Sequence, residues 1–215
     1  LPLLSEPNLQ QQLVEIGYQG KKLEELESLS TAEKANMLFI VQDPYTSYYD
    51  AKVVRDFVAL TQKLGFEPIL LPFKPNGKAM HIKGFLTRFS KTAKTQAEFL
   101  NRVAKLNVPL VGVDPAIVLS YRDEYKEALG DSRGDFHVLT AHEWLTNQLE
   151  SNALQSAVKN IAKSDHTFEW HLFPHCTEST FMPNSPKEWQ HIFAQFGQTL
   201  KVEKVGCCGM AGVFG

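Results

Sequence analysis

The sequence is poor in cysteine. Only three of its 215 residues are cysteines, namely Cys176, Cys207 and Cys208, and they form no C-x-x-C pair. Two adjacent cysteines rarely bond to each other, because a disulfide across one peptide bond strains the ring and the amide. Three cysteines, two of them adjacent, therefore make a poor disulfide framework and indicate a reducing compartment.

Strong net charge and long apolar runs are also lacking. The 22 Lys and Arg residues nearly balance the 24 Asp and Glu residues, which gives no electrostatic reason to expect nucleic acid as a partner. The longest apolar runs, 37–41 and 69–71, are far too short to span a bilayer, and nothing resembles a secretory signal. The chain opens at Leu1 without Met, which suggests a processed product or an excised piece.

Strands and helices are predicted to alternate along most of the chain. Residues 1–34 are polar with weak helical spacing and predict a linker with short helices, arriving from an upstream domain. Alternating strands and helices predict an α/β fold of parallel β-α-β units. The predicted strands are 37–41, 68–73, 109–113, 136–139, 167–173 and 200–205, and the predicted helices are 50–65, 81–89, 92–106, 115–129, 141–149 and 186–196.

An internal repeat organises these elements. A shift of 132 residues without a gap carries Gly65 onto Gly197 and Phe57 onto Trp189, and it carries Pro75-Asn76 onto Cys207-Cys208. The sequence therefore predicts two tandem Rossmann-like repeats, with a linker at 1–34, a first repeat at 35–150 that has no cysteines, and the first half of a second repeat at 151–215. The second repeat is expected to be truncated at its C-terminal end.

The cysteines gather in the second repeat. Gly206 and Gly209 flank the Cys207-Cys208 pair, and glycines allow a sharp turn and the close approach of a bulky inorganic group. The chain from Cys176 to this pair is long enough for one helix and one returning strand, which would bring all three thiolates together. The alternative is that they are ordinary small buried residues.

Residue types alone leave the metal open. Thiolates suit an iron-sulfur centre, whereas zinc would fit a closed set of Cys176, Cys207, Cys208 and His175. We expect His175 to be a neighbour of the metal rather than a ligand. The other histidines lack ligand spacing and are expected to be structural or on the surface: His81, His137, His142, His166, His171 and His191.

The cysteine motif resembles a known family. His175-Cys176 followed by GCCGMAGVFG at 206–215 is similar to the cysteine-rich CCG domain of heterodisulfide reductase subunits and of the iron-sulfur subunits of glycolate and glycerol-3-phosphate dehydrogenases. The segments 41–49 (VQDPYTSYY) and 111–125 resemble the C-terminal region of large bacterial FAD-linked oxidases of the D-2-hydroxyglutarate or D-lactate dehydrogenase type. The resemblance covers residues 36–215.

The resemblance implies an electron-relay module of a flavin-dependent D-2-hydroxyacid dehydrogenase. Cys176, Cys207 and Cys208 would hold a 4Fe-4S cluster together with a later cysteine beyond this chain, and the cluster would pass electrons from FAD in an upstream domain to an acceptor. A ferredoxin-like domain would also lie upstream in the same polypeptide. The first repeat departs from the family at Pro75-Asn76 and near Ile117, where relatives carry cysteines, so its site is expected to serve as scaffold.

Other functions stay open at the level of sequence. The chain could be a docking scaffold with a structural zinc or no metal, and this piece alone is expected to be inactive and to assemble a cluster poorly. A nucleotide-dependent enzyme is disfavoured because the glycine series lacks the G-x-G-x-x-G spacing. Tyr45, Tyr48 and Tyr49 would line a pocket or pack under a loop. The expected location is the cytoplasm, with peripheral attachment at the inner membrane as the alternative.

Overall fold

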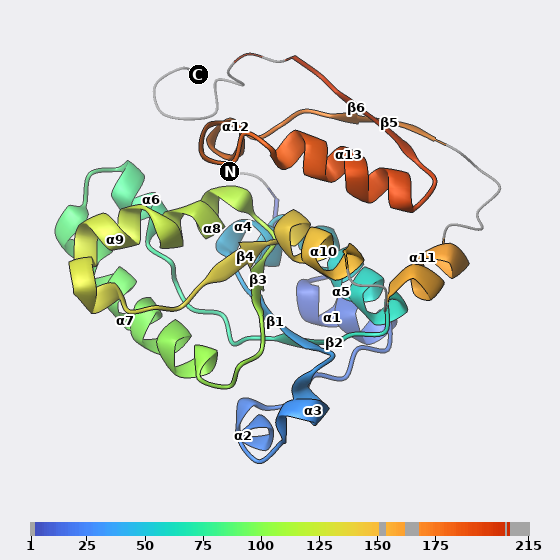
Figure 1. Cartoon of the computed structure of the whole chain (residues 1–215). Helices are drawn as coiled ribbons and strands as arrows, with labels where there is room; N and C mark the ends of the chain where they lie inside the picture. Colours follow the sequence, from blue (N-terminus) through green and yellow to red (C-terminus); the bar gives the residue numbers. More distant parts are fainter. Residues whose placement is uncertain (1–2, 151–153, 162–167, 205, 207–215) are drawn as a thin grey trace. The chain divides into compact units, whose positions relative to one another are not determined.

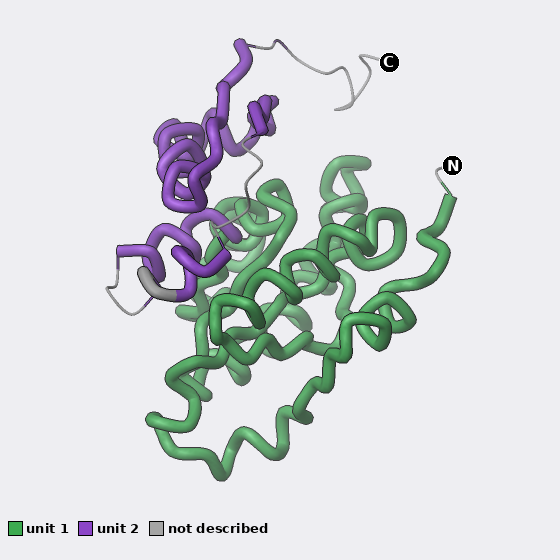
Figure 2. Tube along the Cα trace, turned by 90° about the vertical axis from the view of Figure 1, so that its right-hand side faces the viewer, with its two compact units in different colours: residues 1–140 green, residues 141–215 purple. Residues whose placement is uncertain are grey.

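The protein forms two compact units in a computed structural model, which describes residues 3–150, 154–161, 168–204 and 206. The first unit comprises residues 1–140 and the second residues 141–215 (Figure 2). Both are α/β units built on parallel strands, as the sequence predicts. The repeat boundaries predicted at residues 34 and 150 stay predictions, and the compact units themselves divide between Thr140 and Ala141.

The first unit holds a four-stranded parallel sheet in the order β2-β1-β3-β4 (Figure 1). Its strands are β1 Met37–Val41, β2 Glu67–Leu70, β3 Leu110–Gly112 and β4 Val138–Thr140. Its helices are α1 Leu9–Glu15, α2 Leu23–Leu26, α3 Thr31–Lys34, α4 Pro44–Tyr48, α5 Ala51–Lys63, α6 Lys78–Ile82, α7 Leu86–Ala104, α8 Pro115–Arg122 and α9 Glu124–Leu129, with a 3-10 turn, η1, at Gly130–Arg133.

Helices cover both faces of this sheet. Met37, Phe39 and Val41 point to a core that they share with Phe89 and Leu100 of α7. The intervening residues of β1 are also fully buried, and α5 lies on the side of the sheet opposite α7 (Figure 1). A sheet buried on both faces explains why β1 reads as a continuous apolar run rather than an alternating one.

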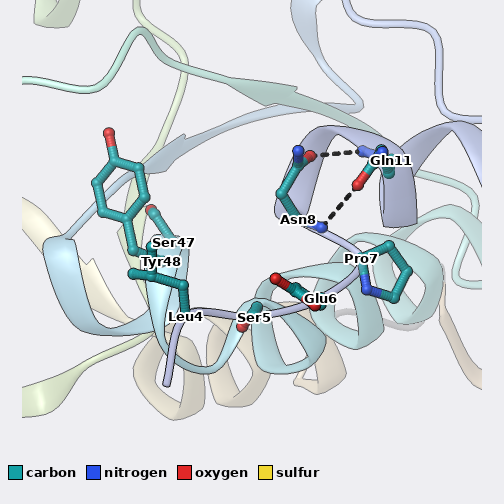
Figure 3. Close-up of a pocket in the computed structure, with 8 residues that line it drawn as sticks. All are labelled: Leu4, Ser5, Glu6, Pro7, Asn8, Gln11, Ser47 and Tyr48. Atoms are coloured by element: carbon teal, nitrogen blue, oxygen red, sulfur yellow. Dashed lines mark hydrogen bonds between the residues drawn. The ribbon is translucent and has the colours of Figure 1, made fainter. Parts of the chain in front are cut away.

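The N-terminal segment is part of the first unit. The amide of Ser5 donates to the carbonyl of Tyr48 (2.8 Å), and the amide of Ala51 donates to the hydroxyl of Ser5 (3.0 Å). A hollow of about 600 Å³ lies along this segment, beside the capping box in which Asn8 and Gln11 bond reciprocally (Figure 3). The short helices expected in residues 1–34 are present, and they pack on the unit through buried leucines, Leu9, Leu13 and Leu26.

The second unit has a two-stranded parallel sheet of β5 Glu169–Leu172 and β6 Thr199–Val202 among its described residues. Its helices are α10 Ala141–Leu149, α11 Gln155–Ile161, α12 Cys176–Phe181 and α13 Ser185–Gln195. Helix α13 packs on one face of the sheet, where Leu200 is buried and the ring of Trp170 lies 6.0 Å from that of Phe193.

The structure repeats with the shift found in the sequence. Strand β1 pairs with β2 from Met37 and Glu67, and β5 pairs with β6 from Glu169 and Thr199, so the same shift of 132 residues relates both strand registers. The same shift carries α4 onto α12 and α5 onto α13. The glycines that end α5 and α13, Gly65 and Gly197, both have positive φ. The two strand-helix-helix-strand segments therefore share one architecture.

Several predicted helices differ from the structure. The residues predicted as helices 81–89 and 92–106 are mostly helical, but the predicted break is misplaced. Helix α6 ends before Gly84, which has φ +75°, and α7 then runs without a break through residues 90 and 91. The helix predicted at 115–129 is divided at Asp123, whose φ of −106° and ψ of −75° separate α8 from α9. The short helices α4 and α12 have no counterpart among the predicted helices.

Candidate metal centre

The candidate site lies at the carboxyl edge of the β5–β6 sheet. Leu172 and Val202 are the last paired residues, and the amide of Glu203 donates to the carbonyl of Leu172 (2.9 Å) just beyond them. Because the strands are parallel, the segments that follow β5 and β6 leave the sheet at the same edge. The segment after β5 reaches Cys176 within four residues, and the segment after β6 reaches Gly206. Of the predicted ligands, Cys207 and Cys208 lie outside the described residues.

Cys176 is the first residue of α12, and it is an exposed free thiol. His175 is the N-cap residue of that helix and is also exposed, but its side chain makes no capping hydrogen bond. The carbonyl of Cys176 accepts from the hydroxyl of Thr180 (2.9 Å). The thiol of Cys176 and the imidazole of His175 thus stand at the start of one short helix, available to a ligand.

No cluster of three or more His, Cys, Asp or Glu side chains is arranged to hold a metal within the described part of the chain. Cys176 and His175 supply two donors there. A site of the predicted kind would need the donors of the segment that follows β6.

A buried polar cluster supports the helix that begins at Cys176. The Glu178 side chain on α12 is only 7% exposed, and it accepts from the hydroxyl of Ser185 and from the indole nitrogen of Trp189 (3.3 Å). Nδ1 of His142 on α10 lies 3.4 Å from Glu178 Oε1, and its Nε2 lies 3.2 Å from Glu188 Oε2. These contacts tie α12 to α10 and α13.

His142 is one of the histidines expected to be structural or on the surface, and the structure shows it to be structural, with 1% of its side chain exposed. Sequence reasoning missed its partners Glu178 and Glu188. They lie far from His142 in the sequence, and no spacing rule links them. A histidine between two carboxylates becomes visible only once α10, α12 and α13 are placed together.

The face of the β5–β6 sheet opposite Leu200 carries a row of charges. Nδ1 of His171 lies 2.5 Å from Glu203 Oε1, and Nζ of Lys201 lies 2.8 Å from Glu169 Oε2. The hydrogen bond from Lys201 lowers the pKa of Glu169, and the same bond raises the pKa of Lys201. Both groups are exposed to solvent, so these pairs contribute little to stability.

The equivalent edge of the first unit is built from different residues. Asp43 stands where the second unit has His175, and it caps α4 by accepting from the amides of Tyr45 (2.8 Å) and Thr46 (2.9 Å). Burial raises the pKa of Asp43, and the nearby charge of Asp114 acts in the same direction. At the turn after β2, the hydroxyl of Tyr125 donates to the carbonyl of Asn76 (2.6 Å). This edge offers no thiolate.

None of the helices that the structure describes is long and apolar enough to cross a membrane.

Comparisons with known proteins found relatives that match the whole length of this chain. The chain is 81% identical, over all 215 residues, to D-2-hydroxyglutarate dehydrogenase of Haemophilus influenzae, and 58% identical to the protein of that name from Escherichia coli. A third relative of that name, from Pantoea ananatis, is 53% identical. The match covers 100% of this chain but only 20–21% of these relatives, so the chain spans about a fifth of their length. No family model and no solved structure matches the chain.

Proposed function

We propose that the chain is the iron-sulfur electron-relay part of a flavin-dependent D-2-hydroxyglutarate dehydrogenase. The relatives that match its whole length carry that enzyme name. The observation that supports a relay site most directly is that β5 and β6 leave their sheet at one edge, one towards an exposed cysteine thiol and the other towards a Cys-Cys pair.

The residues proposed to hold the cluster are Cys176, Cys207 and Cys208, with one further ligand from the rest of the polypeptide. The fit rests on Cys176, whose thiol is free and exposed at the edge that the second strand also reaches. A 4Fe-4S cluster held there would supply one-electron transfer between FAD and an acceptor. FAD and a ferredoxin-like segment are proposed for the other domains of the polypeptide, and the cytoplasm for its location.

A scaffold with structural zinc is the second candidate. It is favoured by His175, which is exposed next to Cys176 and whose side chain makes no capping bond. Three thiolates and one imidazole are a ligand set typical of structural zinc. Zinc has no redox chemistry, so under this proposal the chain would hold domains together rather than carry electrons.

The metal content of the full-length polypeptide distinguishes the two candidates. We would purify it anaerobically, measure iron, acid-labile sulfide and zinc, and repeat this for Cys176→Ser. The relay proposal expects the variant to lose about four irons and as much sulfide per polypeptide. Ser179→Ala, which changes an exposed residue of the same helix, is the matched control and should keep the metal. Loss of zinc alone, or no change, would reject the relay.

A further inference from the structure

The turn that joins α6 to α7 exposes three large apolar side chains, at the periphery of the first unit (Figure 1). Ile82 is 63% exposed, Phe85 52% and Leu86 59%. Gly84 lies between them with φ +75°, and no atom lies within 4 Å of the place that a Cβ would take there. The side chains of this turn therefore face solvent rather than the core. We call Ile82, Phe85 and Leu86 the apolar tip.

The apolar face of α7 extends beyond the core that it covers. Phe89, Ala93, Ala97 and Leu100 follow one another at helical spacing and are buried. Leu86 continues this stripe by one turn towards the start of the helix, where it is exposed. Apolar area left in water costs free energy, so contiguous exposed apolar side chains are typical of a surface that meets a partner.

The chain around the apolar tip is strongly basic. Residues 74–105 hold eight Lys and Arg side chains but a single carboxylate, Glu98, in a chain whose net charge is −2. Among the described residues, Lys78 is the one of these eight that forms an ion pair, with Glu124 of α9. Positive charge is thus concentrated on α6 and α7, and most of it is free to attract an anionic partner.

Three exposed cations form a rim beside the apolar tip. Lys83 lies within the turn, and the guanidinium carbon of Arg88 lies 5.8 Å from the centroid of the Phe85 ring. Lys91 lines a hollow of about 620 Å³ that the tip also lines. Glu127 of α9 lines the same hollow, so one unpaired carboxylate stands against the three cations of the rim. The surroundings of the tip therefore keep an excess of positive charge.

The surface of a bilayer with anionic headgroups suits both the tip and the rim. Apolar side chains gain free energy at the boundary between headgroups and acyl chains, and Lys and Arg side chains are attracted to lipid phosphates. A nucleic acid would match the rim, but its phosphate backbone would leave the apolar tip in water. An acidic protein fits less well, because lysine is depleted in protein interfaces.

We propose that the turn between α6 and α7 binds the surface of a membrane that contains anionic lipid. The apolar tip enters the boundary between headgroups and acyl chains, and the rim of Lys83, Arg88 and Lys91 contacts lipid phosphates. Binding of this kind uses no residue of the second unit, so it does not depend on the cluster.

The test measures binding of the full-length polypeptide to lipid vesicles by flotation. One set of vesicles is phosphatidylcholine alone, and the other contains about 30% phosphatidylglycerol. We expect binding to the anionic vesicles at about 0.1 M salt, weaker binding at about 1 M salt, and little binding to phosphatidylcholine alone.

Two variants separate the rim from the tip. Lys83→Gln should weaken binding to the anionic vesicles about fivefold, since one basic residue near the surface is worth about that factor. Phe85→Ser should weaken it about tenfold through the loss of apolar area. Phe85 is exposed at the N-cap of α7, a position that serine suits, so the fold should be kept.

Matched controls come from the other side of the sheet. Val14 on α1 is 64% exposed, and Lys63 is exposed at the end of α5, on which α1 packs. Val14→Ser and Lys63→Gln should bind the anionic vesicles as the wild type does. The proposal is overturned if the wild type binds neither set of vesicles, or if the controls lose as much as the matched variants. It is also overturned if Phe85→Ser binds as the wild type does, because charge alone would then suffice, as it would for an acidic protein partner.

Discussion

At the scale of single residues, Asp43 shows how the two units use one position differently. It is 2% exposed, and its carboxylate accepts hydrogen bonds from the amides of Tyr45 and Thr46. At the equivalent N-cap the second unit has His175, which is exposed. A capping side chain stabilises a helix start, but burial of its charge opposes that gain. Burial has the larger effect, so the pKa of Asp43 is raised even though its hydrogen bonds act to lower it.

We predict that Asp43 makes the free energy of unfolding depend on pH. Because the folded pKa of Asp43 lies above its ordinary value of 3.8, the native state holds this proton more tightly than the unfolded state does. The contribution of Asp43 to the free energy of unfolding therefore falls as pH rises from 3.8 through the folded pKa, and is lowest above it. Asp43→Asn should remove this component. Urea unfolding at a series of pH values measures the difference between wild type and variant, and a difference independent of pH would contradict the assignment.

We predict that the buried side chain of Glu178 contributes strongly to stability. Glu178→Ala leaves the hydroxyl of Ser185, the indole of Trp189 and the ring of His142 without their shared acceptor. Removing one partner of a buried charged cluster costs about 3–5 kcal/mol. Urea unfolding followed by tryptophan fluorescence should show this loss.

The matched control for that experiment is Glu188→Ala. Its side chain is 35% exposed although it lies 3.2 Å from His142, so its removal should cost about 1 kcal/mol or less. Equal losses in the two variants would show that burial of Glu178 does not decide the stability of this cluster.

At the scale of elements, the sequence predicts what is long and periodic. The apolar run of β1 predicts that strand, and helical spacing together with Gly65 predicts α5. Helix α12 could not be predicted, because its sequence, CTESTF, has no apolar period. Its contacts with α13 form only when the two helices pack together in the folded unit. The cysteines of the candidate site are visible as a motif, whereas the pairing of His142 with Glu178 joins distant parts of the chain and has no sequence signal.

We predict that alanine substitution destabilises the protein to different degrees at two glycines with positive φ. Gly65 has φ +88° and no atom within 4 Å of the place that a Cβ would take, whereas a Cβ on Gly77, with φ +82°, would lie 2.9 Å from Cδ2 of Phe89. Gly65→Ala should cost about 1–2 kcal/mol from backbone strain alone. Gly77→Ala should cost about 1–3 kcal/mol more, because the new Cβ would press on the buried ring of Phe89 and force that ring or the turn to shift. Equal losses in thermal or urea unfolding would contradict the close packing at this turn.

At the scale of the whole molecule, one architecture occurs twice with different chemistry at its carboxyl edge. The first unit fills that edge with Asp43, Asn76 and tyrosines around a cavity, and the second brings Cys176 to it. The shared strand registers show that this contrast is one of residues and not of fold. We propose that the second unit carries electrons and that the first, which has no cysteine, carries no cluster of its own.

Anaerobic reduction of the full-length polypeptide by D-2-hydroxyglutarate tests the relay most directly. Flavin absorbance and the electron paramagnetic resonance signal of reduced iron-sulfur clusters would be recorded for wild type and Cys176→Ser. The account predicts that substrate bleaches the flavin in both proteins, and that the variant lacks the signal of one cluster that the wild type shows. Identical signals in the two proteins, with equal iron content, would contradict it.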